Sequence, residues 1–162
     1  MSKSIFNSPR ALYKAFALGE AITWALLIGG LTIRAIFSGA PGPLITIVGA
    51  IHGAMFLGYA VSAALVGVNN RWGFGRTVLA IALAIIPFAT VPFEISAERK
   101  GALAGAWRTA KSDDSRDDNW FDSLFRWFIA RPLLLALVML VVIFAIFQTL
   151  LFIGPPGGWP QD

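Results

Sequence analysis

Four long apolar stretches, separated by shorter polar ones, dominate the pattern of this chain. They cover residues 15–37, 43–65, 76–95 and 132–153. A helix needs about 20 mostly apolar residues to cross roughly 30 Å of hydrocarbon, and each stretch reaches that length. The pattern therefore predicts an all-α integral membrane protein with four transmembrane helices.

Glycine and proline mark the limits of these stretches. Residues 39–43 form the sequence Gly-Ala-Pro-Gly-Pro, which predicts a turn after the first helix. Pro87 and Pro92 lie inside the third stretch, and each removes one helical hydrogen bond, so we predict a kink near the end of that helix. The chain then divides into a basic N-terminal segment (1–14), a three-helix transmembrane core (15–95), a polar linker (96–131), a fourth transmembrane helix (132–153) and a Pro/Gly-rich tail (154–162).

The end of the polar linker has an amphipathic pattern. Five apolar residues fall on one face at helical spacing: Trp120, Phe121, Leu124, Phe125 and Phe128. This pattern predicts a helix that lies in the headgroup layer of the membrane, with Asp118 as its N-terminal cap. The acidic residues just before it, at positions 113, 114, 117 and 118, are interpreted as a solvated face.

Composition agrees with a membrane location. Of the 162 residues, 57% are hydrophobic and 14% are charged, whereas soluble domains carry about 25% charged residues. The net charge is +4, but the basic residues lie mostly between or before the apolar stretches. We therefore attribute them to topology and lipid headgroups and expect no nucleic-acid partner. With no cysteine and one histidine, we expect no metal site and no cofactor.

The basic residues give conflicting signals about orientation. The N-terminus and the loop at 66–76 contain Lys and Arg without acids, which favours the cytoplasm for both. The linker at 96–131 carries seven Lys and Arg residues, yet four helices would place it on the opposite side. Because the first helix usually dominates, we predict a cytoplasmic N-terminus in a bacterial plasma membrane.

Three ionisable residues, Glu20, His52 and Glu94, lie within or at the edge of apolar stretches. A charge in hydrocarbon costs about 2.5–3.5 kcal/mol on insertion scales, so each residue needs a partner or a water-filled cavity. In a four-helix arrangement Glu94 would lie near the same face as Pro43, and His52 would lie between the two carboxylates. Two interpretations stay open. His52 bonds Glu20, Tyr59 or a backbone carbonyl as a structural pin, or the three residues form a proton relay.

The second helix is rich in small residues. Gly49 and Gly53 form a GxxxG pattern, and Gly58 extends the row. Small residues let helix backbones approach closely, so we predict that this helix lies at the centre of the bundle. No nucleophile has a basic neighbour that would activate it, so we predict no catalytic residue and no enzyme activity.

The order of these residues resembles a known family. Glu20 is followed by Gly49-x-x-His52-Gly53 with Phe56 and Tyr59, then by Arg71-Trp72, Ile86-Pro87-Phe88-Ala89-Thr90 and Phe93-Glu94. Over about residues 10–100 this order is similar to the bacterial integral-membrane family called "domain of unknown function 3817". The resemblance implies a core of three transmembrane helices and says nothing about the residues after 100.

Members of that family from actinobacteria resemble an accessory subunit of the cytochrome bcc–cytochrome oxidase supercomplex. The resemblance thus implies a non-catalytic accessory or assembly subunit, with cytochrome bcc, cytochrome oxidase and lipids as partners. The alternative function is a small oligomeric proton-coupled transporter that uses Glu20, His52 and Glu94.

Overall fold

The computed structural model describes residues 7–37 and 42–154. Residues 1–6 of the predicted N-terminal segment and most of the predicted turn and tail lie outside these ranges. The described chain is helical, in the order α1 (Pro9–Ile36), α2 (Gly42–Asn69), α3 (Phe74–Ala82), η2 (Leu83–Ile85), α4 (Thr90–Arg99), η3 (Ser115–Asp118), α5 (Trp120–Ile129) and α6 (Pro132–Ile153).

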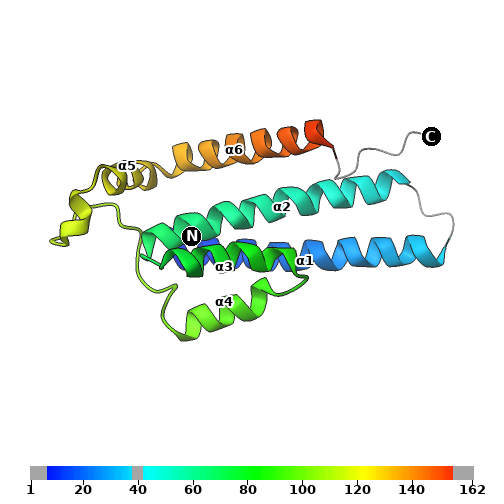
Figure 1. The fold of residues 1–162 in the computed structure, drawn as a ribbon, viewed down its shortest axis with the longest axis horizontal. Helices are drawn as coiled ribbons and strands as arrows, with labels where there is room; N and C mark the ends of the chain where they lie inside the picture. The colour runs from blue at the N-terminus through cyan, green and yellow to red at the C-terminus, as the bar shows by residue number, and fades with distance from the viewer. Residues whose placement is uncertain (1–6, 38–41, 155–162) are drawn as a thin grey trace.

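Three of these helices are long and apolar enough to cross a membrane: Pro9–Ile36, Pro43–Asn69 and Pro132–Ile153. The helix α1 begins before the predicted residue 15, because Ser8 caps it by accepting the Ala11 N–H at 3.1 Å. The helices α1 and α2 pack along each other, and α6 lies against α2 (Figure 1).

The third apolar stretch does not form one helix, so the continuous helix predicted over 76–95 is wrong. Pro87 has no N–H, and it holds Ile86 in an extended conformation (φ −98°, ψ 121°). Phe88 then adopts a left-handed φ of 64°, which reverses the chain. Pro92 causes no kink because it lies in the first turn of α4, where a missing N–H leaves no helical bond unmade.

The break creates a helical hairpin, α3–α4, that enters the bundle and returns to the end it came from (Figure 1). Phe74–Ile85 is too short to span a membrane, since its rise is below about 20 Å. Arg10, at the start of α1, contacts Glu98 near the end of α4, with 2.6 Å between guanidinium nitrogen and carboxylate oxygen. The four predicted spans are therefore not confirmed: the described residues contain three candidate spans and one hairpin.

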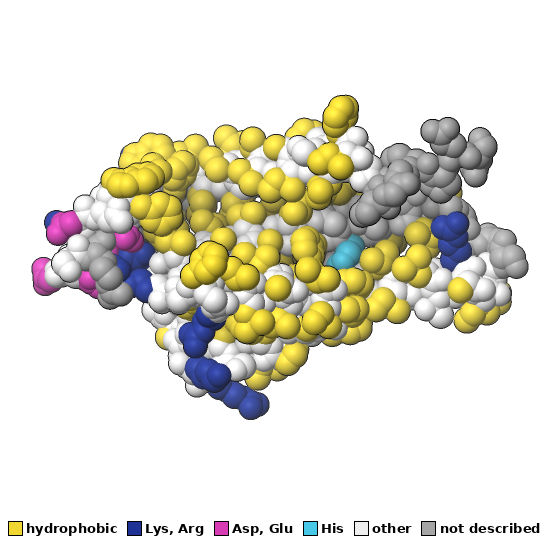
Figure 2. Space-filling model, in the orientation of Figure 1, with side chains coloured by type: hydrophobic (Ala, Val, Ile, Leu, Met, Phe, Trp, Pro, Cys, Tyr) yellow, Lys and Arg dark blue, Asp and Glu magenta, His cyan; other side chains and the backbone are white. Residues whose placement is uncertain are grey.

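One end of the molecule collects the start of α1, the turn at 69–73 and the linker at 100–119, and we call it the polar end. Asn69 and Asn70, at the end of α2, donate hydrogen bonds to carbonyls of the linker. Figure 2 shows the acidic side chains of the visible face gathered there. The hairpin removes the predicted conflict, because the basic linker and the start of α1 lie at the same end.

The linker ends in α5, which is amphipathic as predicted but capped differently. Asn119, not Asp118, accepts the Phe121 N–H at 3.1 Å. Phe125 and Ile129 are buried, whereas Trp120 is 74% exposed. The aromatic residues therefore divide between an inner face and an outer one, as suits a helix at the headgroup layer.

Cysteine labelling tests this arrangement, because the chain has no cysteine of its own. We expect Arg10→Cys and Lys111→Cys to react with an impermeant maleimide from one side of sealed vesicles. A cysteine added after Asp162 should react from the other side. Four spans would instead place Lys111 opposite Arg10 and put both chain ends on one side.

Candidate functional site

Glu20, on α1, is fully buried and holds the beginning of α4. Thr90, the first residue of α4, donates its hydroxyl proton to Glu20 Oε2 at 2.8 Å. Glu20 Oε1 is buried and has no partner among the described residues. The carboxyl group thus joins α1 to the hairpin where the hairpin turns back.

Trp24 supports the same turn one helical turn further along α1. Its indole Nε1 donates to the carbonyl of Ala84, in η2, at 3.2 Å. In a continuous helix this carbonyl would accept the N–H of the residue four positions later. At that residue the chain has already reversed, so the carbonyl lacks its helical partner. Because no water satisfies backbone groups in hydrocarbon, neighbouring helices must supply such partners.

His52, on α2, contacts the same region from the other side. Its Nδ1 lies 3.0 Å from Thr23 Oγ1, which itself donates to the Glu20 carbonyl at 2.9 Å. Because Thr23 has one hydroxyl proton, this network assigns the His52 proton to Nδ1 and leaves Nε2 as an acceptor. The Trp24 and His52 rings pack with centroids 4.4 Å apart. The ring is 9% exposed, and Figure 2 shows it (cyan) reaching the surface.

Tyr59 forms a separate contact and is not bonded to His52. Its hydroxyl lies 2.6 Å from that of Tyr13 on α1 and donates to the Ala80 carbonyl of α3 at 3.1 Å. Both tyrosine side chains are fully buried. Tyr59 therefore ties α1, α2 and α3 together closer to the polar end.

Glu94 lies far from its predicted place. Because α4 runs back toward the polar end, its carboxylate meets Lys14 Nζ at 3.3 Å near the start of α1, rather than the face that holds Pro43. The predicted ladder of Glu20, His52 and Glu94 across the bundle is therefore wrong. Thr23 links His52 to the backbone of Glu20, and Glu94 belongs to an ion pair at the polar end.

The three glycines of α2 that were predicted to pack have different surroundings. A Cβ at Gly58 would lie 2.4 Å from the Phe16 ring of α1, and one at Gly53 would lie 3.3 Å from Phe147 of α6. A Cβ at Gly49 would meet no described atom within 4 Å. Close approach thus requires glycine at position 58, whereas no described helix packs closely on Gly49, so its packing role stays a prediction.

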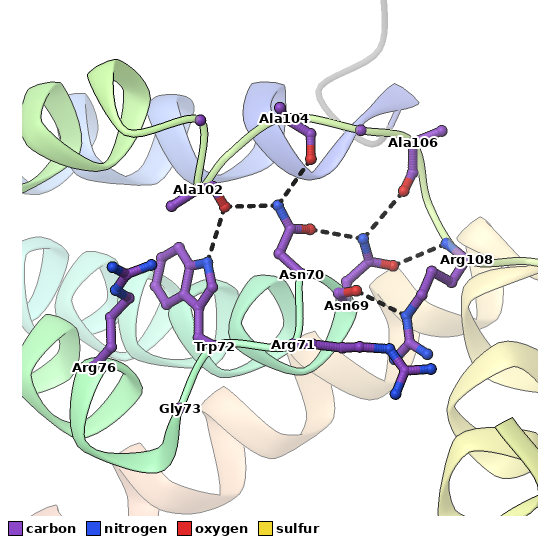
Figure 3. A pocket seen from close by; sticks show the side chains of 12 residues that line it. Asn69, Asn70, Arg71, Trp72, Gly73, Arg76, Ala102, Ala104, Ala106 and Arg108 are labelled. Atoms are coloured by element: carbon purple, nitrogen blue, oxygen red, sulfur yellow. Dashed lines mark hydrogen bonds between the residues drawn. The ribbon is translucent and has the colours of Figure 1, made fainter. Parts of the chain in front are cut away.

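A polar clasp that was not predicted from the sequence lies at the end of α2 and is formed by Asn69, Asn70 and Arg108 (Figure 3). The Asn70 amide donates to the carbonyls of Ala102 and Ala104 at 2.8 and 3.1 Å. Arg108 Nε donates to the Asn69 carbonyl at 2.8 Å. The clasp satisfies carbonyls that the end of α2 leaves free, and paired asparagines after a helix are the local signal for it.

Asp117 anchors the linker and is 1% exposed, which corrects its interpretation as part of a solvated face. Ser112 Oγ and the Ser112 N–H donate to Oδ2 at 2.6 and 2.9 Å. Arg108 Nη1 lies 3.0 Å from Oδ1, which Arg71 and Arg126 also face. The Ser112 hydrogen bonds, helped by Arg71 and Arg108, lower the pKa of Asp117 to about 2.

Metal ligands are not gathered in the part of the chain that the structure describes. No three His, Asp or Glu side chains converge there on a point that could hold a metal ion. The buried polar groups instead bond one another and the backbone, which is an arrangement for holding helices together.

A family model described as "Domain of unknown function (DUF3817)" matches residues 10–99. The chain belongs to this family. The match ends where α4 ends, at Arg99, so the family unit comprises α1, α2 and the hairpin. The linker, α5 and α6 lie outside it, and the three-helix core expected from the resemblance has two long helices and a broken one.

The chain is also similar to "Putative membrane protein SCO5905" of Streptomyces coelicolor, with 38% identity over 96 residues. The match covers 57% of this chain but 11% of the relative's length. No solved structure matches the chain. The family, the relative and the three apolar helices together support a membrane protein with transmembrane helices, in a family whose function is unknown.

Thr90→Val tests the bond between the hairpin and Glu20. The change keeps the shape of the side chain but leaves buried Glu20 Oε2 without its donor, so we expect a loss of about 1–2 kcal/mol in unfolding free energy. Unfolding by sodium dodecyl sulfate in mixed micelles measures it. Thr149→Val is the matched control, because exposed Thr149 bonds only a carbonyl of its own helix. Equal losses in both variants would show that the Glu20 bond contributes nothing.

The lowered pKa of Asp117 predicts how the linker responds to acid. A depressed pKa stabilises the fold above the ordinary value of 3.8, and this stability is lost as pH falls through about 2. We expect pepsin to cut residues 107–126 of the wild type increasingly as pH falls between those values. Asp117→Asn should be cut at all of these pH values, and Asp113→Asn, at an exposed position, should resemble the wild type. Identical behaviour of the two variants would contradict the role of Asp117.

Proposed function

We propose that this protein is a non-catalytic accessory or assembly subunit of a larger membrane complex. The observation behind this proposal is the isolation of α6. Only 11% of its most apolar 18-residue stretch is buried, against 22% for α1. Leu135 and Met139 are its buried residues, whereas Leu140 and Phe144 are 65% and 64% exposed.

The contact between α6 and α2 covers a small part of α6, and it is also loosely packed. A cavity of about 280 Å³ lies between the two helices beside the close approach of Gly53 to Phe147, and its lining is Gly53, Phe56, Leu57, Phe147, Leu150, Leu151 and Gly154. Lipid tails are as apolar as leucine, so helices in a membrane associate through close packing and hydrogen bonds. The described part of α6 makes no hydrogen bond to another helix, and a neighbouring subunit would supply the contacts that its own chain does not.

The buried polar residues support a structural role. Glu20, Thr23, Trp24 and Tyr59 are bonded to the hairpin or to one another. None of these bonds leads from one end of the molecule to the other. The site therefore resembles a set of internal pins more than a pathway for substrate or protons.

The partner we propose is the cytochrome bcc–cytochrome oxidase supercomplex of a bacterial plasma membrane, as the family resemblance implies. The match covers only 11% of the relative's length, so in that protein the matched unit is joined to other segments. This is consistent with a unit that works as part of a larger assembly. The basic residues at the polar end support a cytoplasmic location for that end. The C-terminus would then lie outside.

Purification from native membranes in a mild detergent tests the proposal. We expect the tagged chain to retain cytochrome subunits, seen by mass spectrometry and by haem absorbance. Replacing Leu140 and Phe144 of α6 together by alanine should reduce this retention. Replacing Leu18 and Ile22 of α1, which are 60% and 51% exposed, is the matched control and should have less effect.

A colourless assembly of identical chains would contradict the accessory role. The alternative is a proton-coupled transporter, which one observation favours: Glu20 Oε1 and His52 Nε2 have no bonded partner in the described chain. Proton flux in liposomes that depends on His52 would support it.

A further inference from the structure

A large cavity lies at the polar end, where α2 turns into α3. Its volume is about 640 Å³, and the turn at 69–73, the linker at 101–108 and the side chain of Arg76 line it (Figure 3). Three arginines line it, and two of them are already engaged. Arg71 pairs with Asp114 and Asp117, and Arg108 pairs with Asp117 and Asp122.

Arg76 is different, because its side chain makes no hydrogen bond or ion pair with the part of the chain that the structure describes. In Figure 3 its guanidinium lies on one side of Trp72, whereas Arg71 and Arg108 extend to the other side. On the face shown in Figure 2, no acidic side chain lies beside the basic ones over α3 and α4. The cavity thus contains one uncompensated positive charge within a wall fixed by the polar clasp.

The polar clasp also keeps the cavity open and rigid. The Asn69 and Asn70 amides and the Trp72 indole donate to linker carbonyls at 2.8–3.1 Å, which fixes the wall. Gly73, Gly101 and Gly105 line the cavity, and a Cβ at any of them would meet no described atom within 4 Å. A ligand group can therefore enter beside Arg76 without displacing a side chain.

The surroundings of Arg76 indicate the kind of ligand. It lies in the first turn of α3, and the same helix exposes Phe74 (86%), Val78 (46%) and Leu79 (51%). A lipid held by its phosphate at Arg76 could thus lay its acyl chains along α3. Basic pockets at the cytoplasmic face bind anionic headgroups through this chemistry, and a free phosphate ion would use the guanidinium but not the apolar face.

We propose that this cavity is a binding site for the phosphate group of an anionic phospholipid, with Arg76 as its charged ligand. A lipid so placed would fill the space between the polar end and the hairpin. It would also stabilise the turn between α2 and α3, because it binds only the folded chain.

Native mass spectrometry of the full chain in a neutral detergent tests the site, with phosphatidylglycerol and phosphatidylcholine offered in equal amounts. We expect preferential retention of phosphatidylglycerol. Arg76→Gln should weaken that retention about fivefold, and Arg76→Lys should keep most of it. Arg99→Gln is the matched control, because Arg99 is exposed at the same end but does not line the cavity.

The outcomes distinguish a phospholipid headgroup from a free phosphate ion as the ligand. Equal retention of phosphatidylglycerol by Arg76→Gln and the wild type would overturn the site. Stabilisation by inorganic phosphate that depends on Arg76, without any preference for phosphatidylglycerol, would overturn the lipid assignment. Because the Arg76 guanidinium bonds nothing in the described chain, Arg76→Gln should unfold at the wild-type temperature, which circular dichroism verifies.

Discussion

A backbone that breaks inside an apolar layer must find its hydrogen-bond partners within the protein, and the rest of this structure depends on that constraint. Pro87 breaks the third apolar stretch at a depth where water does not compensate. The helix α1 provides the partners: Trp24 bonds the Ala84 carbonyl, and Glu20 accepts the Thr90 hydroxyl. The buried polar residues, which look like a separate functional site in the sequence, therefore supply hydrogen-bond partners at the helix break.

The same break decides which segments meet at the polar end. Because α4 returns instead of crossing, the linker begins beside the start of α1 and the end of α2. That placement lets Asp117 neutralise arginines from the turn, the linker and α5. It also leaves Arg76 uncompensated at the edge of a cavity, since the nearby acids are already paired.

The sequence allowed the membrane class, three of the long helices and the amphipathic α5 to be predicted, because each depends on local periodicity. The hairpin could not be predicted from the sequence, because a proline in an apolar stretch is compatible with either a kink or a break in the helix. The left-handed Phe88 completes the reversal, and no repeating pattern in the sequence indicates it. Glu94 was misplaced for the same reason. Asn69 and Asp117 meet their partners across turns and linkers that no repeating pattern indicates.

The hairpin reaches only part of the way through the bundle, and this has a consequence for lateral shape. Near the polar end, the cross-section contains α1, α2, α6 and the α3–α4 pair, whereas the far ends of α1 and α2 extend beyond both the hairpin and the end of α6 (Figure 1). The molecule is therefore a wedge. Neighbours packed around it touch along its thick half and leave room in the opposite leaflet, where lipid must fill the space.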